Sequence, residues 1–295
     1  MPNKNNNQAV RSYQKDFKQL LPAVIKKQTY FSDFFGGVEA LDGVQHNDVA
    51  FYVKTSDIPV VVGTAYNKDP NVGMGTGTSK SSRFGDRKEI IYSDMSVPYT
   101  WEYTWHEGID RWTVNNNMEA AMADRVDLQA QAKAHTFDNH YGTFIAANAG
   151  KTEALTAYDE TAVLKLFNTL SAYYINIEAI GRKVAKVGPE LYNIIVDHRL
   201  TTDAKASGAN IDGNTIKMFK GFEIHEVPQA KLGANAALVY IPGIGKSFTG
   251  ITTARTIESE DFDGVAFQGA GKAGEFILDD NKPAVVKVTA PVVTP

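Results

Sequence analysis

The sequence predicts an α+β fold, because segments with helical and with strand patterns follow one another without a regular alternation. Between Asn117 and Asn148, apolar residues recur every three or four positions, which indicates one long amphipathic helix. From Met95 to Trp105, apolar and polar residues alternate strictly, which is typical of a strand with one buried face. A doubly wound parallel sheet would require strands and helices in turn, so this order of segments argues against it.

The predicted helix Asn117–Asn148 is long for a small domain. At 1.5 Å per residue it would extend roughly 48 Å, so we expect an elongated subunit in which this helix forms a spine. Gly142 marks a point at which the helix is prone to bend or to end early. The apolar stripe comprises Met122, Val126, Ala130, Ala134, Phe137, Tyr141 and Ile145.

Shorter elements are predicted on both sides of this helix. The composition of Val49–Val62 favours a strand, and the apolar spacing in Ala162–Ile177 predicts a second helix. Leu191–Val196 is a short apolar run of the length of a buried strand, and Asp212 and Gly213 suit the tight turn of a hairpin. Later strands are expected at 222–227, 236–241, 252–257, 265–268, 275–278 and 284–288.

The chain starts with an Asn-rich polar segment that leads into a helical stripe, which Pro22 is expected to break or restart. An amphipathic terminal arm of this kind either packs on its own domain or docks on a neighbouring subunit. The stripe consists of Val10, Tyr13, Phe17, Leu20 and Val24.

The run Gly63–Glu89, which separates the two predicted strands, is rich in Gly, Ser, Thr and charged residues and has too few apolar residues for a core of its own. Connections of this length are uncommon inside compact domains and usually have a function. We expect the run to be mobile in an isolated subunit and to be ordered by neighbours. Charged residues that would set its register against an adjacent subunit are Arg83, Asp86, Arg87, Lys88 and Glu89.

Composition excludes several classes of protein. The 295 residues include no cysteine, which removes disulfides, thiolate zinc sites and a cysteine nucleophile. The net charge of -4 is unlike the basic footprint of a sequence-specific nucleic-acid binder. The start of the chain lacks the apolar core of a signal peptide, and no stretch approaches the ~20 apolar residues that span a bilayer, so we expect a soluble protein.

Two glycine motifs do not meet the requirements of nucleotide sites. The segment Gly243–Ser247 ends like a phosphate-binding loop, but the glycine required at position 240 is a tyrosine. Gly269–Gly274 satisfies Gly-x-Gly-x-x-Gly, yet the residues after it have a strand pattern instead of the required helix. We interpret these glycines as a turn between strands.

Other candidate sites fail on spacing. Asp110 occupies the place of the second histidine that a metalloprotease motif starting at His106 would need. His135 and His140 are five residues apart and so lie on different helix faces. His198 follows Asp197 without a serine signature that would complete a triad, and the acidic run 258–263 lacks the last ligand of a calcium loop. No catalytic, cofactor-binding or metal-binding residue is assigned.

The order of segments resembles a known family. An N-terminal arm, a long hairpin excursion (about Thr55–Val97), the spine helix and a central domain (about Lys151–Gly250) follow one another. Gly221–Gly243 then has the pattern of a strand, a Pro-containing turn and a returning apolar strand. In Ser259–Val288 an acidic-Phe segment leads into a strand, and Lys-Pro introduces the last strand. This arrangement resembles the major capsid proteins of tailed phages, whose fold was first seen in phage Hong Kong 97.

The resemblance implies a Hong Kong 97-like capsid fold with an N-terminal arm, an extended β-hairpin loop, a peripheral domain with the spine helix, and a central axial domain. The implied boundaries are 1–36 for the arm, 37–54 for the first part of the peripheral domain, 55–97 for the extended loop, 98–150 for the peripheral domain with the spine helix, 151–250 for the axial domain and 251–295 for the closing strands of the peripheral domain.

The resemblance also implies a function. The chain would be a non-enzymatic major capsid protein that assembles into pentamers and hexamers of an icosahedral shell around the genome. It would occur in the virion and, during assembly, in the host cytoplasm. Expected partners are further copies of the chain, portal and decoration proteins and, non-specifically, the packaged double-stranded DNA; no membrane and no cofactor are expected. The roughly hundred-residue N-terminal scaffolding extension of one branch of the family is not found in this sequence, so the resemblance implies either a separate scaffolding protein or assembly without one.

The hypothesised assembly contacts combine the arm and the loop. The covalent lysine–asparagine crosslink of some family members cannot be placed, because several loop lysines are equivalent candidates. Two alternatives stay open: the shell protein of an encapsulin-type bacterial nanocompartment, and a hydrolase with an unrecognised site. The contact residues are Val10, Tyr13, Phe17, Leu20, Lys80, Arg83, Asp86, Arg87, Lys88 and Glu89.

Overall fold

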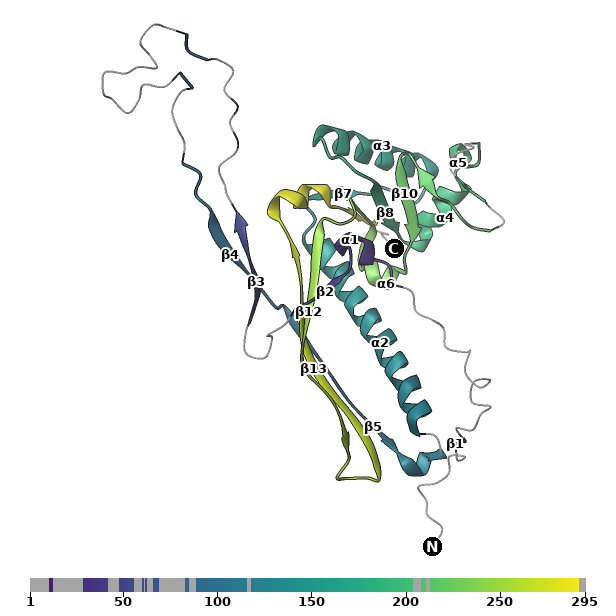
Figure 1. Ribbon diagram of the computed structural model, residues 1–295. Coiled ribbons are helices and arrows are strands. Elements are labelled where there is room, and N and C mark those ends of the chain that lie inside the picture. Colours follow the sequence, from purple (N-terminus) through teal and green to yellow (C-terminus); the bar gives the residue numbers. More distant parts are fainter. Residues whose placement is uncertain are drawn as a thin grey trace, which may run out of the picture. The chain divides into compact units, whose positions relative to one another are not determined.

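The computed structural model describes residues 11–12, 29–41, 48–55, 60, 62, 66–68, 83–84, 89–115, 118–203, 208–210 and 213–291 (Figure 1). The chain divides into two compact units. Met1–Gln45 and Thr100–Pro295 form the first unit, and His46–Tyr99 forms the second.

A mixed six-stranded sheet organises one part of the first unit, with the strand order β7-β14-β11-β8-β10-β9. In its centre β11 runs antiparallel to both β14 and β8, whereas β7 is parallel to β14 and β10 is parallel to β8. The strands are β7 (Lys151–Ala154), β8 (Lys183–Val187), β9 (Met218–Phe219), β10 (Phe222–Glu226), β11 (Asn235–Tyr240) and β14 (Val286–Thr289).

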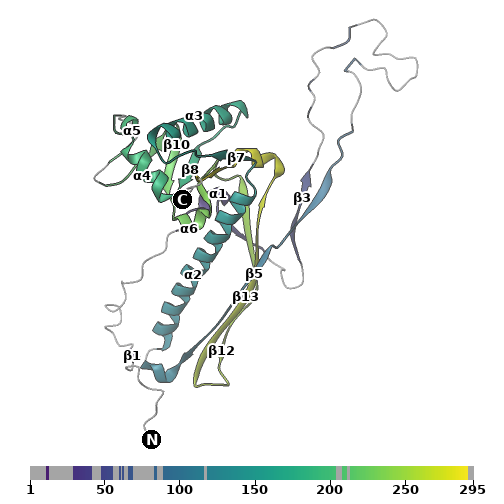
Figure 2. The ribbon, with the colours of Figure 1, turned by 180° about the vertical axis from the view of Figure 1, so that it is seen from behind.

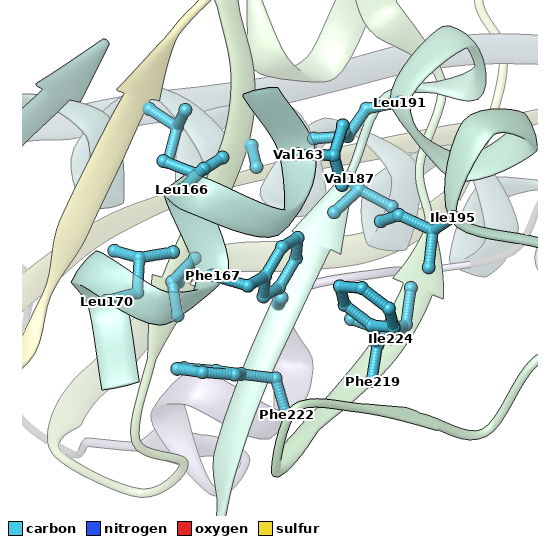
Figure 3. Close-up of a cluster of buried hydrophobic side chains, with 14 of the residues drawn as sticks. Val163, Leu166, Phe167, Leu170, Val187, Leu191, Ile195, Phe219, Phe222 and Ile224 are labelled. Atoms are coloured by element: carbon cyan, nitrogen blue, oxygen red, sulfur yellow. The ribbon is translucent and has the colours of Figure 1, made fainter. Parts of the chain in front are cut away.

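Both faces of this sheet are covered, so the central strand β11 is buried at every position from Ala236 to Tyr240 and shows no polar alternation. In β11, Val239 faces one buried cluster, whereas Leu238 and Tyr240 face another. The first cluster lies under α3 and α4 and contains the interlocking rings of Phe167, Phe219 and Phe222 (Figure 3). The helices of this part are α3 (Glu160–Asn176), α4 (Pro189–Asp197), α5 (Arg199–Asp203) and α6 (Gln229–Leu232).

The spine helix is confirmed as α2 (Met118–Ala147), within one residue of the prediction at each end. Gly142 neither bends nor ends it. A Cβ at this position would lie 2.6 Å from the carbonyl oxygen of Lys231 and 3.0 Å from the ring of Phe31. Glycine is therefore needed for the close approach of other segments to the helix.

Beside α2 lies a four-stranded sheet with the order β2-β12-β13-β5, which extends along the helix in both views (Figures 1 and 2). β12 and β13 form a long antiparallel hairpin with a β-bulge between Ile251 and Thr253, and β5 is antiparallel to β13. β2 covers only the start of β12. The strands are β2 (Val38–Ala40), β5 (Trp101–Asp110), β12 (Gly245–Glu258) and β13 (Gly264–Ile277).

Short elements complete the first unit: α1 (Ser32–Phe35), the 3-10 helices η2 (Arg111–Thr113) and η3 (Asp279–Ala284), and the paired strands β1 (Arg11–Ser12) and β6 (Val114–Asn115). β1 contradicts the helix predicted from Val10 onward, because its backbone pairs with β6. The other stripe positions lie outside the described residues.

The second unit contains a two-stranded antiparallel ribbon of β3 (Val49–Thr55) and β4 (Ser93–Pro98), here named the β3–β4 ribbon. The strand predicted from Val49 is confirmed as far as Thr55. The single strand predicted from Met95 to Trp105 is wrong, because it consists of β4 and β5, which belong to different sheets and are separated at Tyr99 and Thr100.

Leu191–Val196 is also not the predicted strand but part of α4. Its buried residues are Leu191, Tyr192, Ile195 and Val196, a helical spacing that a short apolar run does not distinguish from a strand. Pro189 at the first turn starts the helix.

The glycines 269–274 do not form the predicted turn, because they lie inside β13. A Cβ at Gly269 would lie 1.9 Å from the ring of Trp105, and one at Gly271 would lie 2.4 Å from the ring of Tyr103. The glycines thus make room for aromatic rings of the neighbouring β5. At the predicted hairpin, Asn210 and Thr215 form an isolated bridge through two backbone hydrogen bonds, and Asp212 of the predicted turn lies outside the described residues.

Candidate assembly surfaces

The buried carboxylate of Asp138 on the spine helix binds the backbone of the segment that precedes α1. Both Tyr30 and Phe31 donate backbone N–H bonds to Oδ1 of Asp138, at 2.7 Å and 2.9 Å. Lys231 of α6 forms an ion pair with the other oxygen of this carboxylate, so the buried charge is compensated. Residues 30–35 of the predicted arm therefore pack in the core of the first unit.

A second polar contact of the core involves the half-buried Asp33 of α1. Oδ2 of Asp33 is 3.1 Å from Nζ of Lys186, and the hydroxyl of Tyr240 donates to Oδ1 at 2.8 Å. Burial and the neighbouring Asp33 raise the pKa of Tyr240 well above its ordinary value, so its hydroxyl stays a donor. The first unit is thus held by polar anchors as well as by its apolar clusters.

Glu275 binds the residues at which the first unit resumes after the ribbon. Its carboxylate accepts from Nε1 of Trp101 at 3.0 Å and from Oγ1 of Thr100 at 3.4 Å. Burial raises the pKa of Glu275, whereas the bonds from Trp101 and Thr100 and the nearby His140 oppose this shift. The ring of His140 stacks on Trp101 with centroids 4.0 Å apart, which links α2 to the same corner.

The second unit differs from the first in its surface. Phe84 is 85% exposed and Val60 is 91% exposed. Exposed apolar side chains are concentrated in this part of the sequence, and exposed apolar surface commonly marks interaction sites. The exposed apolar residues of this unit are Tyr52, Val60, Val62, Tyr66, Phe84, Ile90, Ile91 and Tyr92.

Of the predicted loop contacts, the structure describes Arg83 and Glu89. Nη1 of Arg83 donates to the carbonyl oxygen of Asn67 at 2.9 Å, and the guanidinium lies 5.9 Å from the ring centroid of Tyr66. Glu89 is exposed. Arg83 thus joins two segments of the loop, which is a local role besides the predicted contact with a neighbour. The remaining predicted contacts, Val10, Tyr13, Phe17, Leu20, Lys80, Asp86, Arg87 and Lys88, lie outside the described residues.

Sequence reasoning placed the apolar run Ile90–Tyr92 in the extended loop 55–97 but did not include it among the assembly contacts, because the run follows the polar stretch that ends at Glu89. The sequence does contain a signal for this run: three large apolar residues follow one another directly after a charged stretch, and they do not continue a helical or strand periodicity. In the structure all three side chains are exposed. They are the strongest additional candidates for contact with another molecule.

The motifs considered for chemistry lie in ordinary structural positions. Gly243–Ser247 leads into β12, and His106 in β5 bonds to the side chain of Gln268. Arg111 forms ion pairs with Glu258 and Asp263, at the two ends of the acidic turn. Among the residues that the structure describes, no group of three or more His, Asp or Glu side chains could hold a metal ion. None of the described helices combines the length and the apolar character needed to cross a membrane.

Known proteins resemble this chain in fold but not in sequence. No family model matches the chain. No curated protein resembles it in sequence. Solved structures, in contrast, match it over nearly its full length.

The capsid structure of cyanophage P-SCSP1u is 14% identical to this chain, with a TM-score of 0.66. The match covers 94% of this chain and 93% of the cyanophage chain. The mature capsid of bacteriophage PhiM1 shares 13% identity over 93% of this chain and 90% of its own, with a TM-score of 0.64. The capsid of cyanophage Pam1 shares 10% identity over 91% and 94%, with a TM-score of 0.55. These likenesses confirm the predicted α+β capsid fold of the Hong Kong 97 type.

Proposed function

We propose that this chain is the major capsid protein of a tailed bacteriophage. Copies of the chain assemble into pentamers and hexamers of a closed icosahedral shell, which encloses the genome in the virion. The protein acts as a building block and not as an enzyme. Assembly rests on many moderate contacts that symmetry repeats around the shell.

The observation that carries this proposal is the exposed apolar surface of the second unit. A two-stranded ribbon is at best marginally stable alone in water. Fixing the backbone costs about 1 kcal/mol per residue, and this unit offsets little of that cost, because eight of its described large apolar side chains remain exposed. Burying a large apolar side chain contributes about 1.5–3 kcal/mol, so covering several of them in a contact supplies on the order of 10 kcal/mol. Repeated copies of the same chain provide such a cover.

The fold supports the same conclusion. The matching chains come from phage capsids, and the likeness covers both units of this protein as well as nearly the whole of those chains. A shared fold over nearly the full length of both chains supports the same role as a repeated subunit of a shell, although fold alone does not determine function.

Other partners follow from the same role. We infer a separate scaffolding protein that guides assembly, a portal protein at one vertex, decoration proteins on the outer surface, and assembly in the host cytoplasm. The packaged double-stranded DNA would meet the inner face non-specifically. The net charge of -4 limits attraction to the phosphates, which keeps the DNA free to move during filling.

The test is to express the protein alone and together with the genes that surround its own, and to examine both samples by analytical sedimentation and electron microscopy. We expect pentamers, hexamers or shells of megadalton mass in at least one sample. A protein that stays monomeric in every sample would overturn the proposal.

A further inference from the structure

A groove lies between the second half of α2 and the short helix α6, which are neighbours in both views (Figures 1 and 2). Its volume is about 800 Å³, which is within the range of protein sites that take up a ligand or a segment of chain. The groove is hollow because the wall residues that face it from both sides include several without a large side chain. These small residues are Gly142, Ala146, Gly233 and Ala234. The hollow is here named the α2–α6 groove.

The α2–α6 groove lies on one particular face of the six-stranded sheet. Tyr30, Ala146 and Leu232 line the groove, and all three belong to or pack against the buried cluster that contains Leu238 and Tyr240. The groove is therefore on the α2 side of the sheet, opposite the side that α3 and α4 cover.

The last strand of the sheet runs along one wall of the groove. Thr289, at the end of β14, pairs with Asn235, and Ala290 then donates its N–H to the carbonyl oxygen of Ala234 at 3.3 Å. Asn235 and Ala234 are both wall residues. Because the two segments are antiparallel, the chain after Ala290 heads toward Gly233 and α6.

The alternation of side chains along β14 shows which later residues face the groove. Val286, Val288 and Ala290 contact the cluster under α3 and α4, whereas Val285 belongs to the cluster on the α2 side. Side chains alternate between the faces of a strand, so a continuation of β14 places Val293 on the α2 side. From Pro291 to Val293 an extended chain advances about 7 Å, which brings Val293 level with α6.

The residues after Pro291 have a composition that suits this position. Pro291 is half-buried and is the last described residue, and Val292, Val293, Thr294 and Pro295 follow it. None of the four is charged, and the β-branched Val292, Val293 and Thr294 favour an extended strand. A valine side chain gains stability when it moves from water into an apolar groove.

We propose that the chain continues the six-stranded sheet beyond Pro291 and that Val293 of the same copy occupies the α2–α6 groove. Residues 292–295 thereby join the sheet to the spine helix, in addition to the ion pair between Lys231 and Asp138. The inference concerns a single subunit, so it goes beyond the proposed function and does not depend on it.

The first test uses introduced cysteines, because the chain has none of its own. Val293→Cys is combined in one chain with Ala146→Cys or, one turn earlier on the same wall, with Thr143→Cys. After oxidation of the dilute protein, non-reducing electrophoresis and peptide mass spectrometry identify the disulfides. We expect a disulfide within the chain for at least one of the two pairs.

The matched control replaces Val293→Cys with Val292→Cys, which the alternation places on the opposite face of the sheet. Its yield of disulfide should be at least about tenfold lower, because cysteines on opposite faces do not meet the distance that a disulfide requires. Equal yields for positions 292 and 293, or no disulfide from either wall position, would overturn the inference. Disulfide-linked dimers in place of the intrachain bond would overturn it too, since the groove then takes residue 293 of a second copy.

The second test measures stability without any crosslink. Val293→Ser should lower the melting temperature of the full chain by about 2–4 °C, and removal of residues 292–295 should lower it at least as much. The matched control is Thr294→Ser, which changes the neighbouring residue on the other face and should melt like the wild type. If Val293→Ser and the shortened chain also melt like the wild type, the groove is not filled by Val293 and the inference is wrong.

Discussion

The six-stranded sheet and the β3–β4 ribbon are built from similar residues but differ in what covers them. β8 and β11 are almost entirely buried between two layers of helices. β3 and β4 contain Val, Phe, Tyr and Met in similar density, yet only Val97 of these strands is buried. Strand-forming sequence is therefore not sufficient for a stable sheet. Whether a sheet is stable in the isolated subunit depends on the layer of residues that packs against it, and a sheet without such a layer needs contacts with another copy.

Shortening the loop of the second unit should give the largest effect on assembly. Replacing Gly63–Glu89 with an Asn-Gly turn joins the two arms of the excursion directly. We expect the circular dichroism and melting temperature of the subunit to stay the same, because the first unit has its own core, and shells to be abolished. Sedimentation measures the second effect.

The control for this change replaces the same residues with a Gly/Ser linker of equal length. It should also fail to assemble if the side chains form the contact, and should assemble if length alone matters. Normal shells from the Asn-Gly variant would show that the loop contributes nothing to assembly.

Two substitutions by alanine, one in each region, should differ in their effect on the free energy of unfolding. Phe167 is buried in the first cluster, so Phe167→Ala should lower the free energy of unfolding by about 3–5 kcal/mol. Tyr52 is exposed, so Tyr52→Ala should change it by less than about 0.5 kcal/mol. Urea unfolding of the isolated subunit measures both. Similar losses from the two variants would contradict the distinction between the regions.

Breaking the ion pair on the spine helix should have a comparable effect. Lys231→Met leaves the carboxylate of Asp138 buried and uncompensated, which costs about 3–5 kcal/mol. In Asp138→Asn/Lys231→Met the charge is removed, so most of the loss should be recovered. If the double variant is no more stable than Lys231→Met, the pair does not act through its charge.

A smaller, pH-dependent effect is expected at Glu275, whose pKa burial raises from 4.5. Because the folded carboxyl keeps its proton to higher pH than the unfolded one, its contribution to stability is present at low pH and is lost as the pH rises through the folded pKa. Glu275→Gln mimics the protonated form. Its melting temperature should match wild type near about pH 4 and exceed it increasingly toward neutral pH. A difference that does not vary with pH would contradict this account.

Residue patterns predicted most of the fold but failed where tertiary context decides. The spacing of apolar residues predicted the extent of α2. It did not predict the buried face throughout, because Phe137, Tyr141 and Ile145 of the stripe are buried whereas Val126, Ala130 and Ala134 are exposed. The run Leu191–Val196 was too short to separate helix from strand, and the glycines of β13 resembled a turn because the rings of Trp105 and Tyr103 that require them come from another strand.

The candidate surface was predictable only in part. The length and polarity of Gly63–Glu89 marked an excursion, and the structure adds the exposed run Ile90–Tyr92 beside it. No sequence pattern could indicate that β2 pairs with β12 only from Ser247 to Thr249, since the extent of strand pairing depends on where the neighbouring strand ends.

The most direct test of the difference between the two regions is hydrogen exchange of the same protein as an isolated subunit and in assembled shells. We expect the amides of β8 and β11 to be protected in both states, and those of β3 and β4 to exchange fast in the subunit and slowly in the shell. Equal protection of β3 and β4 in both states would show that the ribbon is stable without other copies and would contradict the account.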